Sequence, residues 1–113
     1  MKQALVVRSD VKMSRGKLAV QCSHASYSAA SAAKRPALQQ WAKDGQKKVV
    51  LKAKDIALLM QLRDACIRLR LPHALISDAG MTELSPGTIT CLGIGPADEA
   101  AVNKVTGSLP LLK

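Results

Sequence analysis

Short runs of apolar residues alternate along the chain with longer stretches in which apolar residues recur at helical spacing. The short runs are rich in β-branched side chains and predict four buried strands, at residues 4–7, 49–51, 74–77 and 89–94. The longer stretches predict four helices, at residues 15–33, 37–43, 56–71 and 97–105. The predicted order is therefore β-α-α-β-α-β-β-α, without repeats or a linker, and it indicates a layered α/β domain.

Capping residues and prolines mark the expected boundaries of the helices. Ser14 and Asp55 can each cap a helix that begins at the next residue. Pro36 suits the first turn of the second helix, and Pro96 is expected to begin the last one. Pro72 is expected to end the third helix. The pattern does not fix the relative direction of the last two strands, because the loop between them is long.

The size and the cysteine content narrow the class of protein. A chain of 113 residues is expected to form one domain that spans residues 1–113. Three scattered cysteines, Cys22, Cys66 and Cys91, do not make a disulfide framework and favour a reducing compartment. The first apolar run is too short for a signal peptide, and no run reaches membrane-spanning length. We therefore expect a cytoplasmic protein that makes no use of a membrane.

Positive charge is concentrated in the first half of the chain. Residues 1–54 carry twelve Lys or Arg and two Asp or Glu, a net charge of +10, whereas residues 55–113 carry five and six, a net charge of −1. This asymmetry favours a polyanionic partner such as nucleic acid, although a well-solvated surface is the alternative. Because Tyr27 and Trp41 are the only aromatic residues, we expect nucleic acid to be bound through phosphates and shape rather than stacked bases.

Residues 78–96 form the most informative segment, because they are far more polar and glycine-rich than a simple connection requires. Asp78 follows directly after a predicted strand, and hydroxyl groups follow it at Thr82, Ser85, Thr88 and Thr90. Turn-forming residues fix the positions of such side chains. The segment is typical of a binding or catalytic site.

The start of the first predicted helix breaks an electrostatic rule. Arg15 and Lys17 lie in its first turn, where the helix dipole disfavours each cation by about 0.3–1 kcal/mol. Lys17, Gln21, His24 and Ser28 then follow on one face of the helix. Such a start could hold an anion or an oxyanion. The alternative is that Lys17 is solvated and that His24 is a hydrogen-bonded packing residue.

Lys17 and Asp78 together suggest hydrolysis of an activated acyl bond, but simple anion binding stays open. A Lys–Asp pair can orient a water molecule and stabilise negative charge on a carbonyl oxygen. The sequence lacks a complete phosphate-binding loop, dinucleotide fingerprint or nucleophile elbow, and Cys22 and His24 are the only close pair of metal-ligating residue types. We expect neither a metal nor a cofactor.

Two long motifs identify a family that the chain resembles. Residues 7–13 with residues 16–25 (GKLAVQCSHA) resemble the N-terminal signature of the archaeal and eukaryotic type, or type II, of peptidyl-tRNA hydrolases. Residues 78–88 (DAGMTELSPGT) with Gly93 to Pro96 resemble the second signature, and residues 105–107 resemble the family's ending. The resemblance implies a three-layer α/β/α domain around a four-stranded mixed sheet. It also implies hydrolysis, without a metal, of the ester that joins a peptide to tRNA.

The resemblance also suggests roles for individual residues. The family's lysine, aspartate and loop threonine fall on Lys17, Asp78 and Thr82, which we predict to be catalytic. Either Asp78 or a water that it holds would attack, Lys17 would stabilise the oxyanion or keep Asp78 ionised, and Thr82 would fix the geometry. Contacts with peptidyl-tRNA are expected from eight further residues: Gln21, His24, Ser85, Thr90, Lys12, Arg15, Lys47 and Lys48. A homodimer is a further expectation.

Two other classes of function stay open. A non-catalytic tRNA-binding or RNA-binding module of the same fold would explain the charge but leaves residues 78–96 without a role. A hydrolase of small acyl or amide compounds would use the same polar cluster but leaves the basic half without one.

Overall fold

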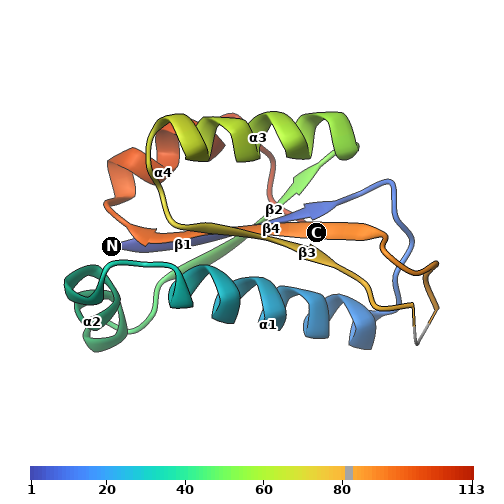
Figure 1. The fold of residues 1–113 in the computed structure, drawn as a ribbon, viewed down its shortest axis with the longest axis horizontal. Coiled ribbons are helices and arrows are strands. Elements are labelled where there is room, and N and C mark those ends of the chain that lie inside the picture. Colours follow the sequence, from blue (N-terminus) through green and yellow to red (C-terminus); the bar gives the residue numbers. More distant parts are fainter. Residues whose placement is uncertain (81–82) are drawn as a thin grey trace.

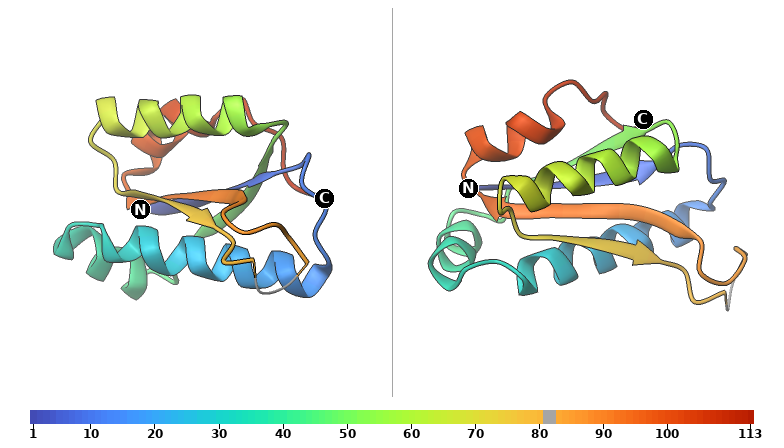
Figure 2. Two further views of the ribbon diagram at one scale, coloured as in Figure 1. Left: turned by 45° about the vertical axis from the view of Figure 1, so that its right-hand side comes forward. Right: turned by 45° about the horizontal axis from the view of Figure 1, so that its top comes forward.

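The computed structural model describes residues 1–80 and 83–113, and these form one twisted four-stranded sheet with helices on both faces (Figure 1). The elements in order are β1 (Lys2–Arg8), α1 (Arg15–Ser31), α2 (Arg35–Lys43), β2 (Lys48–Ala53), α3 (Ile56–Arg68), β3 (His73–Ser77), β4 (Ile89–Ala97) and α4 (Glu99–Thr106). Helices α1 and α2 cover one face, and α3 and α4 cover the other (Figures 1 and 2). The predicted three-layer α/β/α architecture is confirmed.

The sheet is mixed, with strand order β2-β1-β4-β3. Strand β1 pairs in parallel with β2 and antiparallel with β4, and β3 pairs antiparallel with β4. The direction that the sequence left open is therefore antiparallel. Beyond β4 and α4, residues 110–112 run along the outer side of β2, where Lys52 N donates to Pro110 O (3.0 Å) and Leu112 N donates to Val50 O (3.0 Å).

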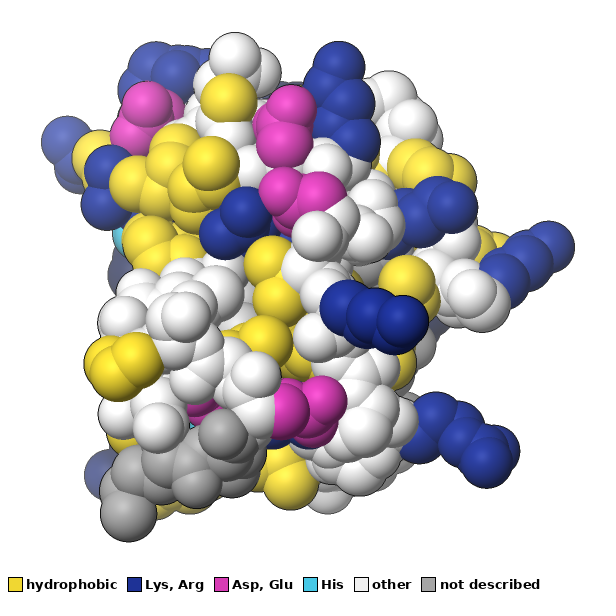
Figure 3. All heavy atoms as spheres, turned by 90° about the vertical axis from the view of Figure 1, so that its right-hand side faces the viewer, with side chains coloured by type: hydrophobic (Ala, Val, Ile, Leu, Met, Phe, Trp, Pro, Cys, Tyr) yellow, Lys and Arg dark blue, Asp and Glu magenta, His cyan; other side chains and the backbone are white. Residues whose placement is uncertain are grey.

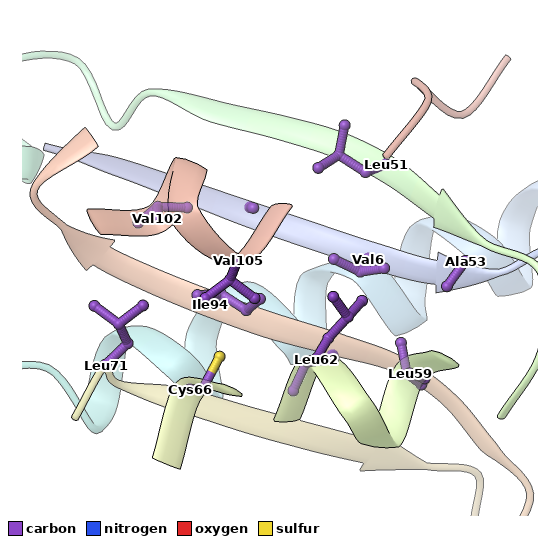
Figure 4. Close-up of a cluster of buried hydrophobic side chains, with 12 residues drawn as sticks. Val6, Leu51, Ala53, Leu59, Leu62, Cys66, Leu71, Ile94, Val102 and Val105 are labelled. Atoms are coloured by element: carbon purple, nitrogen blue, oxygen red, sulfur yellow. The ribbon is translucent and has the colours of Figure 1, made fainter. Parts of the chain in front are cut away.

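Alternating side chains of β1 divide the core between the two faces of the sheet. Ala4 and Val6 belong to the larger cluster under α3 and α4, where leucine side chains of α3 and valine side chains of α4 point onto the sheet (Figure 4). Leu5 and Val7 belong to the smaller cluster under α1. Helix α1 lies very close to β4, because a Cβ atom on Gly93 would come within 2.3 Å of Ala25 O.

The predicted helix caps are confirmed, whereas two proline boundaries are wrong. The side chain of Asp55 accepts from Leu58 N (2.9 Å), and that of Ser14 accepts from Lys17 N (3.2 Å). Pro96 does not begin a helix: β4 continues through Ala97, which pairs with Lys2, so α4 begins only at Glu99.

The third helix also ends before its proline. Helix α3 stops at Arg68, four residues ahead of Pro72, because Arg70 takes a left-handed conformation (φ 55°) and Leu71 N donates back to Cys66 O (2.9 Å). Leu71 is thereby buried against the core. A local turn with an apolar contact, rather than proline, ends the helix.

Candidate active site

The first turn of α1 and the carboxyl end of β3 meet at one end of the sheet. Lys17 Nζ donates a hydrogen bond to Asp78 Oδ1 and forms an ion pair with it. The side chain of Lys17 is 10% exposed and that of Asp78 only 3%. The structure therefore brings together the two residues, 61 positions apart in the chain, that the sequence singled out.

Asp78 is held by its own loop as well as by Lys17. Its Oδ2 accepts from Gly80 N (2.7 Å), its backbone N donates to Thr88 O (2.7 Å) and its carbonyl accepts from Gly87 N (2.8 Å). Gly80 takes a φ of +79°, and a Cβ atom there would lie 2.5 Å from Pro86. The base of the loop is thus closed by backbone hydrogen bonds, which fixes the direction of the carboxylate.

Glu83 is a site residue that sequence reasoning missed. Its carboxylate accepts from both Ser14 Oγ (2.6 Å) and Ser14 N (3.2 Å), and Ser14 is the residue that caps α1. Helix α1 has no acidic residue in its own first turn, so Asp78 and Glu83 bring negative charge to it from the β3–β4 loop. A search for carboxylates within the helix could not find this arrangement, because Glu83 is 69 positions from Ser14.

Gln21 and Thr90 form a second, deeper polar pair behind the site. Gln21 Nε2 donates to Thr90 Oγ1 (2.7 Å), and Thr90 Oγ1 donates to Ile76 O (3.3 Å). The two side chains are 2% and 0% exposed. They join α1 to β4 and β3 from within, which holds the start of the helix against the strand that carries Asp78.

The remaining predicted residues of this end lie on the surface, apart from one that the structure does not describe. His24 is exposed on α1, so its interpretation as a packing histidine is wrong. Ser85 is exposed, and its carbonyl accepts from Thr88 Oγ1 (2.8 Å). Lys12 and Arg15 are exposed beside the start of α1. Thr82 lies outside the described residues.

Lys47 and Lys48 are not brought together with this site. They precede and begin β2, whose Lys48 pairs with Gln3 at the opposite end of β1. The seven residues of β1 separate the two ends of the sheet by about 20 Å. Lys47 forms an exposed ion pair with Glu99 (2.8 Å), and Lys48 Nζ lies 4.7 Å from the centre of the Trp41 ring.

Exposed cations lie on the surface at the end of the molecule that carries the Lys17–Asp78 pair. Figure 3 views this end of the molecule and shows several Lys and Arg side chains that project from its surface. Among the residues described, no three His, Cys, Asp or Glu side chains are placed to hold a metal ion, and none of the helices is long and apolar enough to cross a membrane.

The fold and the site together define the class of protein. It is a small α/β/α domain with a buried Lys–Asp pair at one end of its mixed sheet. The chain belongs to the family Peptidyl-tRNA hydrolase PTH2, whose model matches residues 1–112. It is 54% identical to the peptidyl-tRNA hydrolase of Methanopyrus kandleri, over 99% of this chain and 98% of that protein. The peptidyl-tRNA hydrolases of Thermococcus sibiricus and Haloquadratum walsbyi are 50% and 49% identical over at least 97% of either protein.

Proposed function

We propose that this chain is a peptidyl-tRNA hydrolase, which cleaves the ester between a peptide and the 3′-terminal ribose of tRNA. The observation that carries this function is the buried Lys17–Asp78 pair in a chain that matches the family over nearly its whole length. Residues 1–113 act as one such domain. The reaction releases the peptide as a carboxylic acid and the tRNA with a free 3′ hydroxyl group, so it needs only water as a second substrate.

The geometry of the pair suggests how water is activated. Each oxygen of a carboxylate can accept more than one hydrogen bond, so Asp78 can hold a water while it contacts Lys17 Nζ and Gly80 N. The water attacks the ester carbonyl, the carbon–oxygen bond to the ribose breaks, and the proton that the water loses ends on the ribose oxygen. Asp78 orients the water, and positioning of this kind supplies much of the rate for an activated ester.

Lys17 stabilises the charge that develops during the attack. An ammonium group has three donors, of which one is directed at Asp78 Oδ1. Another can be directed at the carbonyl oxygen as it becomes an oxyanion, in a site that is almost shielded from solvent. Thr82 is proposed to fix this geometry, and attack by a hydroxyl group with a covalent intermediate is the alternative route.

Substrate contacts are proposed at two levels. The exposed residues Lys12, Arg15, His24 and Ser85 surround the site and can contact the tRNA or the peptide directly. The buried Gln21–Thr90 pair supports these contacts by fixing α1 on β4. Lys47 and Lys48 would contact a part of the tRNA far from the ester, since the phosphate backbone extends well beyond one end of the sheet.

The test is release of free tRNA from an N-blocked aminoacyl-tRNA. Wild-type protein should cleave it in a single turnover, and Asp78→Ala and Lys17→Ala should each lose cleavage. Salt-sensitive binding without cleavage at any excess of wild-type protein would favour the RNA-binding module. Cleavage that charge reversal at Lys47 and Lys48 leaves unchanged would favour a hydrolase of small acyl compounds.

The site of action and the assembly state complete the proposal. The reaction would recycle tRNA from peptidyl-tRNA that ribosomes release during translation, so the proposed site of action is the cytoplasm. A homodimer is proposed as the assembly, and light scattering at several protein concentrations would distinguish it from a monomer.

A further inference from the structure

Two hollows lie end to end between α1 and β2, on the face of the sheet that α1 covers only in part. The first has a volume of about 390 Å³ and is lined by residues that include Leu5, Cys22, Tyr27, Trp41 and Lys48. The second, of about 320 Å³, is lined by residues that include Val7, Lys12, Leu18, Lys52 and Lys113. We call the two hollows together the α1–β2 groove.

Strand and helix periodicity show that the two hollows are in line. Leu5 and Val7 are alternate residues of β1, so both face the groove and form its floor. Leu18 and Cys22 are one helical turn apart and form one wall, and Lys48 and Lys52 are on one face of β2 and form the other. The groove therefore follows the side of α1 that faces β2 as far as the first turn of the helix. Lys17 belongs to the same turn, and its side chain reaches around it to Asp78 at the end of β3.

The groove combines an apolar floor with cations and with both aromatic side chains of the chain. Lys12, Lys48, Lys52 and Lys113 line it, and none of the described residues that line it is acidic. The ring of Trp41 is buried against the wall, where its Nε1 donates to Lys47 O (2.8 Å) and Lys48 lies over it. Tyr27, in contrast, is 77% exposed at the rim of the groove.

This combination of features is typical of sites that bind unpaired nucleic acid. A basic groove follows the phosphates, while exposed aromatic rings stack on the bases, which are accessible only in a single strand. A tRNA presents such a strand at its 3′ end, which carries the ester. We propose that the α1–β2 groove holds the unpaired 3′ strand of tRNA, with Tyr27 stacked on a base upstream of the ester.

The length of α1 agrees with this placement. Lys17 and Tyr27 are ten residues apart, which corresponds to about 15 Å along the helix. That distance accommodates a short stretch of nucleotides between the reacting ribose and the stacked base. The inference rests on the proposed function, and it replaces the expectation from the sequence that aromatic stacking plays no part.

Binding of uncharged RNA tests the groove separately from catalysis. Two RNA hairpins that mimic the tRNA acceptor stem, one with the unpaired 3′ strand and one blunt, are titrated against wild type, Tyr27→Ala and Tyr27→Phe. Wild type should bind the hairpin with the 3′ strand more tightly, and Tyr27→Ala should lose about tenfold of that preference, the ratio that corresponds to 1.4 kcal/mol of base stacking. Tyr27→Phe should retain it, because the ring is kept.

Matched control variants distinguish binding in the groove from the general effects of losing a charge or an exposed side chain of α1. Val20→Ala removes another exposed apolar side chain of α1, and Lys104→Ala removes an exposed cation from α4 on the opposite layer. Neither should change the preference, whereas Lys52→Ala should weaken binding of the hairpin with the 3′ strand. Alkylation of Cys22, which is half-buried in the groove, should also slow when this hairpin is bound but not with the blunt one.

Three results would overturn the inference. Equal binding of both hairpins by wild-type protein would place the 3′ strand elsewhere. An unchanged preference in Tyr27→Ala would exclude stacking on that ring. A change in KM that depends on the length of the peptide, with RNA binding unchanged, would assign the groove to the peptide. Each can occur while wild-type protein still cleaves its substrate, whereas failure of the proposed function would appear as lost cleavage with binding intact.

Discussion

Replacing Lys17 with methionine would remove the ammonium group that the buried Asp78 carboxylate contacts. Both side chains are at most 10% exposed, so the charge of Asp78 cannot be compensated fully by water. Removal of one partner of a buried ion pair typically costs about 3–5 kcal/mol of stability. At about 4 °C per kcal/mol for a chain of this size, the melting temperature should fall by about 10–20 °C.

Urea unfolding of four proteins measures this effect. They are wild type, Lys17→Met, Asp78→Asn and the double variant, which removes both charges and should recover a large part of the lost stability. None of the three variants should hydrolyse peptidyl-tRNA. Lys47→Met is the matched control, because its ion pair with Glu99 has side chains that are 58% and 47% exposed and should be worth less than about 1 kcal/mol. A loss of under 1 kcal/mol in Lys17→Met, or strict additivity in the double variant, would refute the argument from burial.

Three further predictions concern the thiols, the loop and the packing of α1. Burial raises the pKa of Cys66 to about 11 and that of Cys91 to about 12, so both thiols stay protonated at pH 8. Iodoacetamide should therefore modify Cys22 first, as mass spectrometry of the digested protein would show. Glu83→Ala should lower kcat/KM about three- to tenfold through loss of the hydrogen bonds that hold the loop to α1, with an unchanged Kd for tRNA; an unchanged kcat/KM would show that the contact is dispensable. Gly93→Ala should cost about 3 kcal/mol in urea unfolding, because its Cβ atom would meet a backbone carbonyl oxygen at 2.3 Å, and a loss below 1 kcal/mol would mean that α1 moves away easily.

The sequence was sufficient to predict the layered fold and to single out Lys17 and Asp78, which the structure brings together. Strand and helix periods are local properties, and caps such as Ser14 and Asp55 act within three residues. The prediction that Pro96 begins a helix was wrong because Pro96 belongs to β4. Its place there depends on the pairing of the neighbouring Ala97 with Lys2, which is a contact between distant segments. Tertiary pairing of this kind overrides local signals.

The sequence could not show which residues of the site lie next to one another in space. Glu83 looks like one polar residue of a loop, and only the fold places its carboxylate on Ser14 at the start of α1. Tyr27 and Trp41 likewise look like two isolated aromatic residues, 14 positions apart. Their shared hollow arises because α2 follows α1 on the same face of the sheet and leaves Trp41 facing the same space (Figure 1).

The tail on the outer side of β2 has a consequence for self-association. The backbone groups at the edge of a sheet are a template for a strand of another chain. Here Lys52 N and Val50 O are already satisfied by residues 110–112 of the same chain. A second copy could extend the sheet past β2 only by displacing this tail, so a homodimer would form through the helical layers or beside β3. Substitutions that loosen the tail would instead expose β2 and promote aggregation.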